Sequence, residues 1–246
     1  DSAFAPTPGA LKEFIDGVHR GSSQAYTEYR GDADLRARLA EKLATFTGHP
    51  VSAAEELIIT PGTQGALFLA LGAMPGDRVA IVRPDYFANR KLVEFLGAEV
   101  VPVQLDYLSN TDNAGLDLEQ LEGAFKSGVR TFLFSNPNNP TGVIYSPQEI
   151  ERIAELANQY GVTVIADQLY SRLVYDDNTY THLRASGIAD ENVVTIMGPS
   201  KTESLSGYRL GVAFGAAHLI DRMEKLQAIV SLRAPGYSQA VLRTWF

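Results

Sequence analysis

The sequence predicts an α/β fold in which a mainly parallel, seven-stranded sheet lies between two layers of helices. Short runs of β-branched residues alternate along the chain with longer helical patterns, which is the rhythm of βαβ units. Several of these runs are almost unbroken apolar stretches, as in strands that helices cover on both faces. The 246 residues, 45% of them hydrophobic and 20% charged, suffice for one large globular domain or slightly more.

Seven segments are predicted to be strands because β-branched and apolar residues dominate them. Parallel strands end at a common edge of a sheet, where α/β proteins bind ligands, so side chains that follow these strands are expected to gather there. The predicted strands are 57–60, 78–82, 99–103, 131–135, 163–166, 193–197 and 210–214.

Six segments have the periodicity or the end signals of helices. Leu35 and Leu39 fall on one face of the first. Ser146 is a predicted N-cap, and Gly161 closes the helix that Ser146 begins. The predicted helices are 34–46, 63–71, 86–96, 118–125, 147–160 and 217–232.

Composition excludes several classes of function. The formal net charge of −8 gives no electrostatic reason to expect a nucleic-acid or anionic-membrane partner. The chain has no cysteine, which excludes disulfides, thiolate zinc sites and cysteine nucleophiles. No stretch approaches the roughly 20 apolar residues of a membrane span, and the N-terminus lacks a secretory signal pattern. A cytoplasmic protein is therefore expected.

Neither a metal site nor a serine hydrolase is predicted. The histidines, which are His19, His49, His182 and His218, form no His-x-x-x-His pair and have no neighbouring cluster of ligands. The chain also lacks the Gly-x-Ser-x-Gly elbow of the α/β hydrolases.

A glycine turn at 60–65 follows one predicted strand and opens a helix. The backbone N–H groups at Gly62 and Thr63, with the Thr63 hydroxyl, would form a cradle for a phosphate group. The segment lacks the lysine and the glycine spacing of nucleotide-binding loops, so taken alone it fits an ordinary turn better.

Three further polar segments follow other predicted strands. The loop 136–142 contains two prolines that stiffen it, so it can aim the amide of Asn139. Asp167 stands at the end of a buried strand, with Tyr170 three residues on. Lys201 follows the strand 193–197, and a lysine in that position suits covalent capture of an aldehyde cofactor. Each residue alone has an ordinary structural explanation, but one parallel sheet would gather them all at one edge.

Together these motifs resemble those of the fold-type I pyridoxal-phosphate-dependent enzymes, specifically the class I/II aminotransferases. The loop 136–142 reads N-P-x-N-P-T-G, and 200–211 reads S-K-x-x-x-x-x-G-x-R-x-G. Residues 26–36 match the pattern Y-x-x-x-x-G-x-x-x-L-R. The resemblance runs from about Phe4 to the end of the chain and implies the fold-type I large domain, with pyridoxal 5′-phosphate as cofactor.

The resemblance also implies roles for the residues around the cofactor ring. Lys201 would form the Schiff base and then move a proton. Asp167 would pair with the pyridine nitrogen, which lets the ring act as an electron sink. Asn139 and Tyr170 would hydrogen-bond the 3′-oxygen of the ring, and Tyr86 would stack on its face.

The phosphate of the cofactor would be held by Gly62, Thr63, Ser200 and Arg209. Tyr26 would reach the phosphate of a neighbouring subunit, which implies a homodimer with shared active sites. In one departure from the family pattern, Gly198 stands where many relatives carry a serine or threonine hydroxyl.

The activity implied is transfer of an amino group between an L-amino acid and a 2-oxo acid. Two alternatives stay open: other pyridoxal-phosphate chemistry, such as that of a β-lyase or an amino-acid oxidase, and a non-catalytic binding or regulatory domain on the same scaffold. The expected organisation is an N-terminal segment (1–25) that belongs to a small domain and covers the site, a cofactor-binding large domain (26–233) and the start of a C-terminal small domain (234–246). Most of the small domain is expected to be missing from this chain.

Overall fold

The computed structural model describes residues 5–74, 76–109, 112–175 and 178–246. Phe4 and the rest of 1–4, which belong to the predicted N-terminal segment, lie outside this part. Within the described residues, seven strands form one sheet in the order β1-β7-β6-β5-β4-β2-β3. The strands are β1 (Leu57–Pro61), β2 (Arg78–Arg83), β3 (Glu99–Gln104), β4 (Thr131–Ser135), β5 (Thr163–Asp167), β6 (Val193–Met197) and β7 (Leu210–Gly215). The predicted fold class is confirmed.

The strand pairing is mainly parallel. β2 pairs in parallel with both β3 and β4, and β4 pairs in parallel with β5, whereas β1 runs antiparallel to β7. The predicted end of the fifth strand at residue 166 was one residue short. Asp167 is the last residue of β5, because it lies in register with Ser135 and its carbonyl accepts the N–H of Asn136 at 2.9 Å.

The helices agree with the sequence where end signals are strong. α7 begins after Ser146 in a full capping box and ends at Gly161 in the left-handed conformation, as predicted. The predicted end of α9 at Leu232 was wrong, because Leu232 has a left-handed φ of 65° and the helix ends two residues earlier. The α-helices are α1 (Pro8–His19), α2 (Gly21–Gln24), α3 (Ala33–Thr47), α4 (Gly62–Ala73), α5 (Phe87–Phe95), α6 (Leu118–Lys126), α7 (Pro147–Tyr160), α8 (Pro199–Thr202), α9 (Ala217–Val230) and α10 (Gly236–Gln239).

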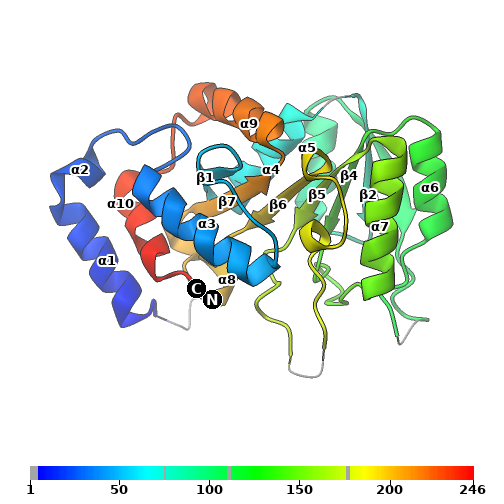
Figure 1. Ribbon diagram of the computed structural model, residues 1–246, viewed down its shortest axis with the longest axis horizontal. Coiled ribbons are helices and arrows are strands. Elements are labelled where there is room, and N and C mark those ends of the chain that lie inside the picture. The colour runs from blue at the N-terminus through cyan, green and yellow to red at the C-terminus, as the bar shows by residue number, and fades with distance from the viewer. Residues whose placement is uncertain (1–4, 75, 110–111, 176–177) are drawn as a thin grey trace. The chain divides into compact units, whose positions relative to one another are not determined.

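The chain divides into two compact units: unit 1 comprises 1–70 and 196–246, and unit 2 comprises 71–195. In unit 1, α1 packs against the C-terminal segment that contains α10, although the two are more than 200 residues apart in sequence (Figure 1). Its buried core includes Leu35, Leu39, Leu57, Ile59, Val212, Phe214, Val241 and Trp245. The domain limits proposed from the sequence stay a prediction.

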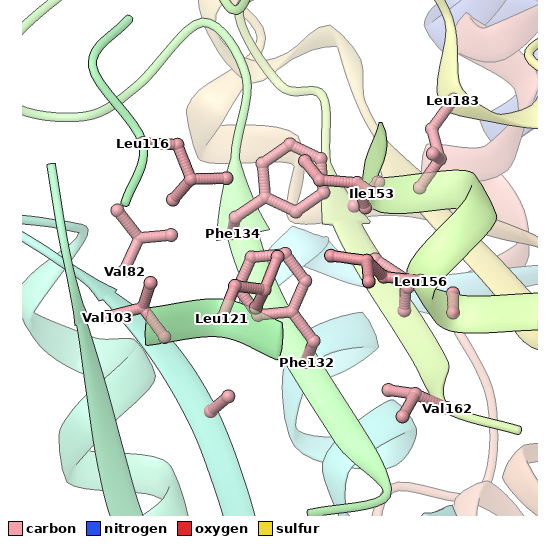
Figure 2. Packing of buried hydrophobic residues seen from close by; sticks show 14 of the residues in the cluster. Val82, Val103, Leu116, Leu121, Phe132, Phe134, Ile153, Leu156, Val162 and Leu183 are labelled. Atoms are coloured by element: carbon pink, nitrogen blue, oxygen red, sulfur yellow. The ribbon is translucent and has the colours of Figure 1, made fainter. Parts of the chain in front are cut away.

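The core of unit 2 lies between its strands and the helices α6 and α7 (Figure 2). The rings of Phe132 and Phe134 stack with centroids 5.3 Å apart. The residues of this cluster labelled in Figure 2 are Val82, Val103, Leu116, Leu121, Phe132, Phe134, Ile153, Leu156, Val162 and Leu183.

A buried glutamate ties a loop to α7 in unit 2. The carboxylate of Glu149 accepts the backbone N–H groups of three successive residues, 114–116, each at 3.0 Å. It also accepts the N–H and the hydroxyl of Ser146. Glu149 therefore joins the capping box of α7 to the chain that precedes α6.

Candidate functional site

In unit 1 the first residue of α4 and the strand β7 are packed closely around two glycines, Gly62 and Gly211. Gly62 opens α4 with φ of 81°, and a Cβ there would lie 2.5 Å from Nη2 of Arg209. A Cβ on Gly211 would lie 2.5 Å from both the carbonyl carbon of Gly62 and the nitrogen of Thr63. The guanidinium of Arg209 and the strand β7 thus lie directly against the first turn of α4.

This packing places two positive groups side by side. The N-terminus of the 12-residue helix α4 carries the positive end of the helix dipole. The guanidinium of Arg209 lies beside it, held by a hydrogen bond of 3.0 Å from Nη1 to the carbonyl of Ser206. Positive groups placed side by side favour the binding of an anion such as a phosphate or a carboxylate, so this part of unit 1 is a candidate anion site.

Lys201 lies in the short helix α8, next to the buried Ser200. Gly198, three residues before the lysine, would with a Cβ come within 2.8 Å of Cγ2 of Thr63. The methyl group of Thr63 thus fills the space that a serine or threonine at 198 would need. This explains the departure from the family pattern and places the Thr63 side chain next to residue 198.

Tyr26 lies on the surface of unit 1. The residue is 79% exposed, and the guanidinium carbon of Arg233 lies 4.3 Å from the centre of its ring. The same guanidinium carbon lies 4.4 Å from the ring centre of Tyr29. The role of Tyr26 at the phosphate of a second subunit stays a prediction.

In unit 2, three of the expected site residues influence one another. Asp167 is buried, and its Oδ1 accepts the N–H of Leu169 at 3.1 Å. Burial raises the pKa of Asp167 to about 6. Burial, then the charge of Asp167 and then Tyr86 raise the pKa of the Tyr170 phenol. Tyr170 therefore lies within electrostatic reach of both Asp167 and Tyr86.

The loop that carries Asn139 is fixed by side-chain hydrogen bonds. Oδ1 of Asn138 accepts both the N–H and the hydroxyl of Thr141. Nδ2 of Asn138 donates to the carbonyl of Pro84 at 3.1 Å, and the N–H of Asn139 donates to Oγ of Ser135 at 3.0 Å. The position of Asn139 thus depends on the end of β4 and on the residue that follows β2.

The structure adds polar residues that the sequence reasoning did not single out. Nδ1 of His182 lies 3.0 Å from Oε1 of Gln168, the neighbour of Asp167, and burial lowers the pKa of His182 to about 4. The hydroxyl of Tyr180 donates to the carbonyl of Asn136 at 2.7 Å. The sequence around Tyr180 and His182 has no local pattern that would predict their position near the end of β5.

A second addition is the pair formed by Asp85 and Ser135, which meet at 2.7 Å. The available signal was a polar residue at the end of one apolar strand and another shortly after a second such strand. Among the described residues, no helix is long and apolar enough to cross a bilayer.

Comparison with known proteins places all 246 residues within the model of one family, described as "Aminotransferase class I and II". An aspartate aminotransferase of Sulfolobus acidocaldarius is 31% identical over 236 residues, which are 95% of this chain and 58% of that protein. The crystal structure of an aspartate aminotransferase from Rhodobacter sphaeroides is 70% identical, with a TM-score of 0.95 over 98% of this chain and 63% of that one. The N-succinyldiaminopimelate aminotransferase of Mycobacterium tuberculosis is 27% identical, with a TM-score of 0.90 over 98% of this chain and 63% of that one. The chain thus spans less than two thirds of the length of these proteins.

Proposed function

Because the chain belongs to the class I and II aminotransferases, we propose that it transfers an amino group between an L-amino acid and a 2-oxo acid with pyridoxal 5′-phosphate as cofactor. The observation that carries the proposal is the guanidinium of Arg209 packed against the N-terminus of α4. This arrangement favours an anion, and the cofactor would bring a phosphate dianion to it.

The residues present fit this cofactor in their chemistry. The phosphate matches the two positive groups of unit 1, and the amine of Lys201 matches the aldehyde. The buried carboxyl of Asp167 matches the pyridine nitrogen, because a protonated ring nitrogen beside it offsets the burial that raises its pKa. When bound, the cofactor supplies an aldehyde carbon for the amino group and a ring that takes up the electron pair left at Cα.

The proposed acid–base work belongs to two residues. The carboxylate of Asp167 would keep the ring nitrogen protonated. Nζ of Lys201 would hold the aldehyde end of the cofactor and, as a free amine, would serve as the base for the proton at Cα of the substrate.

The remaining residues bind and orient. The amide of Asn139 and the hydroxyl of Tyr170 would donate to the 3′-oxygen, and the ring of Tyr86 would cover one face of the cofactor and exclude water. The N–H groups of 62–63, the hydroxyls of Thr63 and Ser200 and the guanidinium of Arg209 would hold the phosphate. We take aspartate as the amino donor, on the likeness to the Rhodobacter sphaeroides enzyme.

Replacing the lysine tests this function. Lys201→Ala should lose the visible absorbance band of the cofactor-loaded protein and the 2-oxo acid formed from aspartate when an acceptor 2-oxo acid is present. Lys225→Ala, a change on α9 of an exposed lysine paired with Asp221, is the control and should keep both. Full turnover by Lys201→Ala would refute the proposed role of the lysine.

A homodimer in the cytoplasm completes the proposal. Sedimentation velocity of the purified chain tests the dimer, and a single species with the mass of one chain would contradict it. Cell fractionation tests the location. Tyr26 is proposed to act on the phosphate in the second subunit.

A further inference from the structure

The carboxylate of Asp85 accepts four hydrogen bonds in unit 2. Its Oδ1 accepts the N–H of Tyr86 at 2.6 Å, Nδ2 of Asn89 at 3.1 Å and the hydroxyl of Ser135 at 2.7 Å. Its Oδ2 accepts the N–H of Ser135 at 3.0 Å. The four donors come from two segments that are about 50 residues apart in sequence.

The side chain of Asp85 accepts a hydrogen bond from β4 beyond the point where the pairing of β2 with β4 ends. β2 pairs with β4 from Val79 opposite Thr131 to Ile81 opposite Leu133. Two residues further along β4, the N–H of Ser135 bonds to Oδ2 of Asp85 instead. The side chain of Asp85 thus continues the link between β2 and β4 to the end of the strand.

This link reaches two of the proposed cofactor contacts. The hydroxyl of Ser135 donates to Asp85 and accepts the N–H of Asn139. On the other side, Asp85 accepts the N–H of Tyr86 itself. Ser135 also lies in register with Asp167 on the neighbouring strand. One carboxylate therefore fixes the backbone of both Tyr86 and Asn139.

We propose that Asp85 is a positioning residue that sets the places of Asn139 and Tyr86 by accepting hydrogen bonds from Ser135 and from the start of α5. The link to cofactor binding rests on the proposed function. The link to the loop geometry does not, because every contact involved lies within the protein.

The role requires the ionised form of Asp85. All four neighbours donate, so a proton on the carboxyl would meet groups that already donate to it. Burial, and to a smaller extent the charge of Asp167, raises the pKa of Asp85 to about 7, while the hydrogen bonds from Ser135 and Tyr86 lower it. The phenol of the buried Tyr145 also interacts electrostatically with Asp85. Acidification through pH 7 should therefore release the loop.

Hydrogen exchange of the cofactor-free chain tests the positioning directly. In Asp85→Asn, one oxygen becomes an NH₂ group that cannot accept from Ser135. The amides of Ser135 and Asn139 should therefore exchange about tenfold faster than in the wild type. Asp117→Asn is the matched control, because Asp117 caps α6 through the N–H of Gln120 at 2.8 Å and asparagine caps a helix equally well. Unchanged exchange at both amides in Asp85→Asn would overturn the proposal.

Cofactor affinity gives the second measurement. Asp85→Asn should bind pyridoxal 5′-phosphate about tenfold more weakly than the wild type at pH 8. The ratio of the two dissociation constants should shrink as the pH falls through 7, because only the wild type loses an acceptor there. A ratio that does not change with pH would overturn the proposal, since a purely structural effect predicts it.

The outcomes separate the two proposals. If the wild type binds no pyridoxal 5′-phosphate, the proposed function fails, and the exchange rates still decide the role of Asp85. If Asp85→Asn does not fold, Ser135→Ala replaces it, because that change removes only the hydroxyl between Asp85 and Asn139. Faster exchange at Asn139 in Ser135→Ala supports the link, and unchanged exchange there overturns it.

Discussion

Gly211→Ala is the sharpest test of how closely β7 packs against the first turn of α4. The added Cβ would lie 2.5 Å from two backbone atoms of the α4 turn and 2.7 Å from the carbonyl oxygen of Gly62. Carbon atoms pack at about 3.5–4.0 Å, so β7 and the α4 turn must separate by roughly 1 Å. Overpacking of this kind costs about 1–3 kcal/mol, and three backbone contacts place Gly211→Ala near the upper end, at about 3 kcal/mol.

The same separation should weaken cofactor binding. A hydrogen bond to a charged group contributes about 1.5–3 kcal/mol, so losing one phosphate donor should reduce the affinity for pyridoxal 5′-phosphate by roughly tenfold to a hundredfold. Urea unfolding, followed by the fluorescence of the buried Trp245, measures the stability. Absorbance titration with the cofactor measures the affinity.

Gly123→Ala is the matched control for the same chemical change. Gly123 lies in the middle of α6, and a Cβ there would meet no atom within 4 Å. Because alanine favours a helix over glycine by about 0.5–1 kcal/mol, this variant should be slightly more stable than the wild type. If Gly211→Ala unfolds at the wild-type urea concentration and binds the cofactor normally, the close packing of β7 on the α4 turn is refuted.

Two further predictions concern buried polar side chains of unit 2. Glu149→Ala leaves the N–H groups of 114–116 without their acceptor and should lower the free energy of unfolding by about 3 kcal/mol or more. Glu151→Ala, an exposed change on the same helix, should have little effect. Equal urea midpoints for the two variants would contradict this prediction. Burial lowers the pKa of His182 to about 4, so between about pH 6.5 and 4 the unfolded chain binds the proton first and stability falls as the pH falls. His182→Asn should flatten the dependence of the melting temperature on pH in that window. The control His19→Gln, a change of an exposed histidine, should leave the dependence as in the wild type. Identical profiles for His182→Asn and the wild type would count against a buried, neutral His182.

The strands were the most predictable part of the fold. All seven were placed from their apolar runs, because strands covered on both faces leave little room for polar residues. The helix α1 was not predicted, although Thr7 caps it and Pro8 opens it. Its apolar residues Leu11, Phe14, Ile15 and Val18 recur at the spacing of a helix, so these signals were sufficient to predict α1 from the sequence.

The candidate site was predictable only where its residues form local strings. The glycine turn and the loop 136–142 can be recognised because each motif is continuous in sequence. The contact of Asp85 with Ser135 depends on β2 lying beside β4, which is a property of the sheet order. A lone aspartate after a strand does not reveal a partner 50 residues away.

The methyl group of Thr63 lies where a Cβ at residue 198 would be, so the effects of substitutions at these two positions depend on each other. A serine at 198 has no room for its Cβ while Thr63 is present, because the two carbons would lie 2.8 Å apart. A mutational path from this chain to a hydroxyl at 198 must therefore first shrink residue 63. The order of the two substitutions is therefore constrained, and the carbonyl oxygen of Leu210, 3.1 Å from the same Cβ, must also give way.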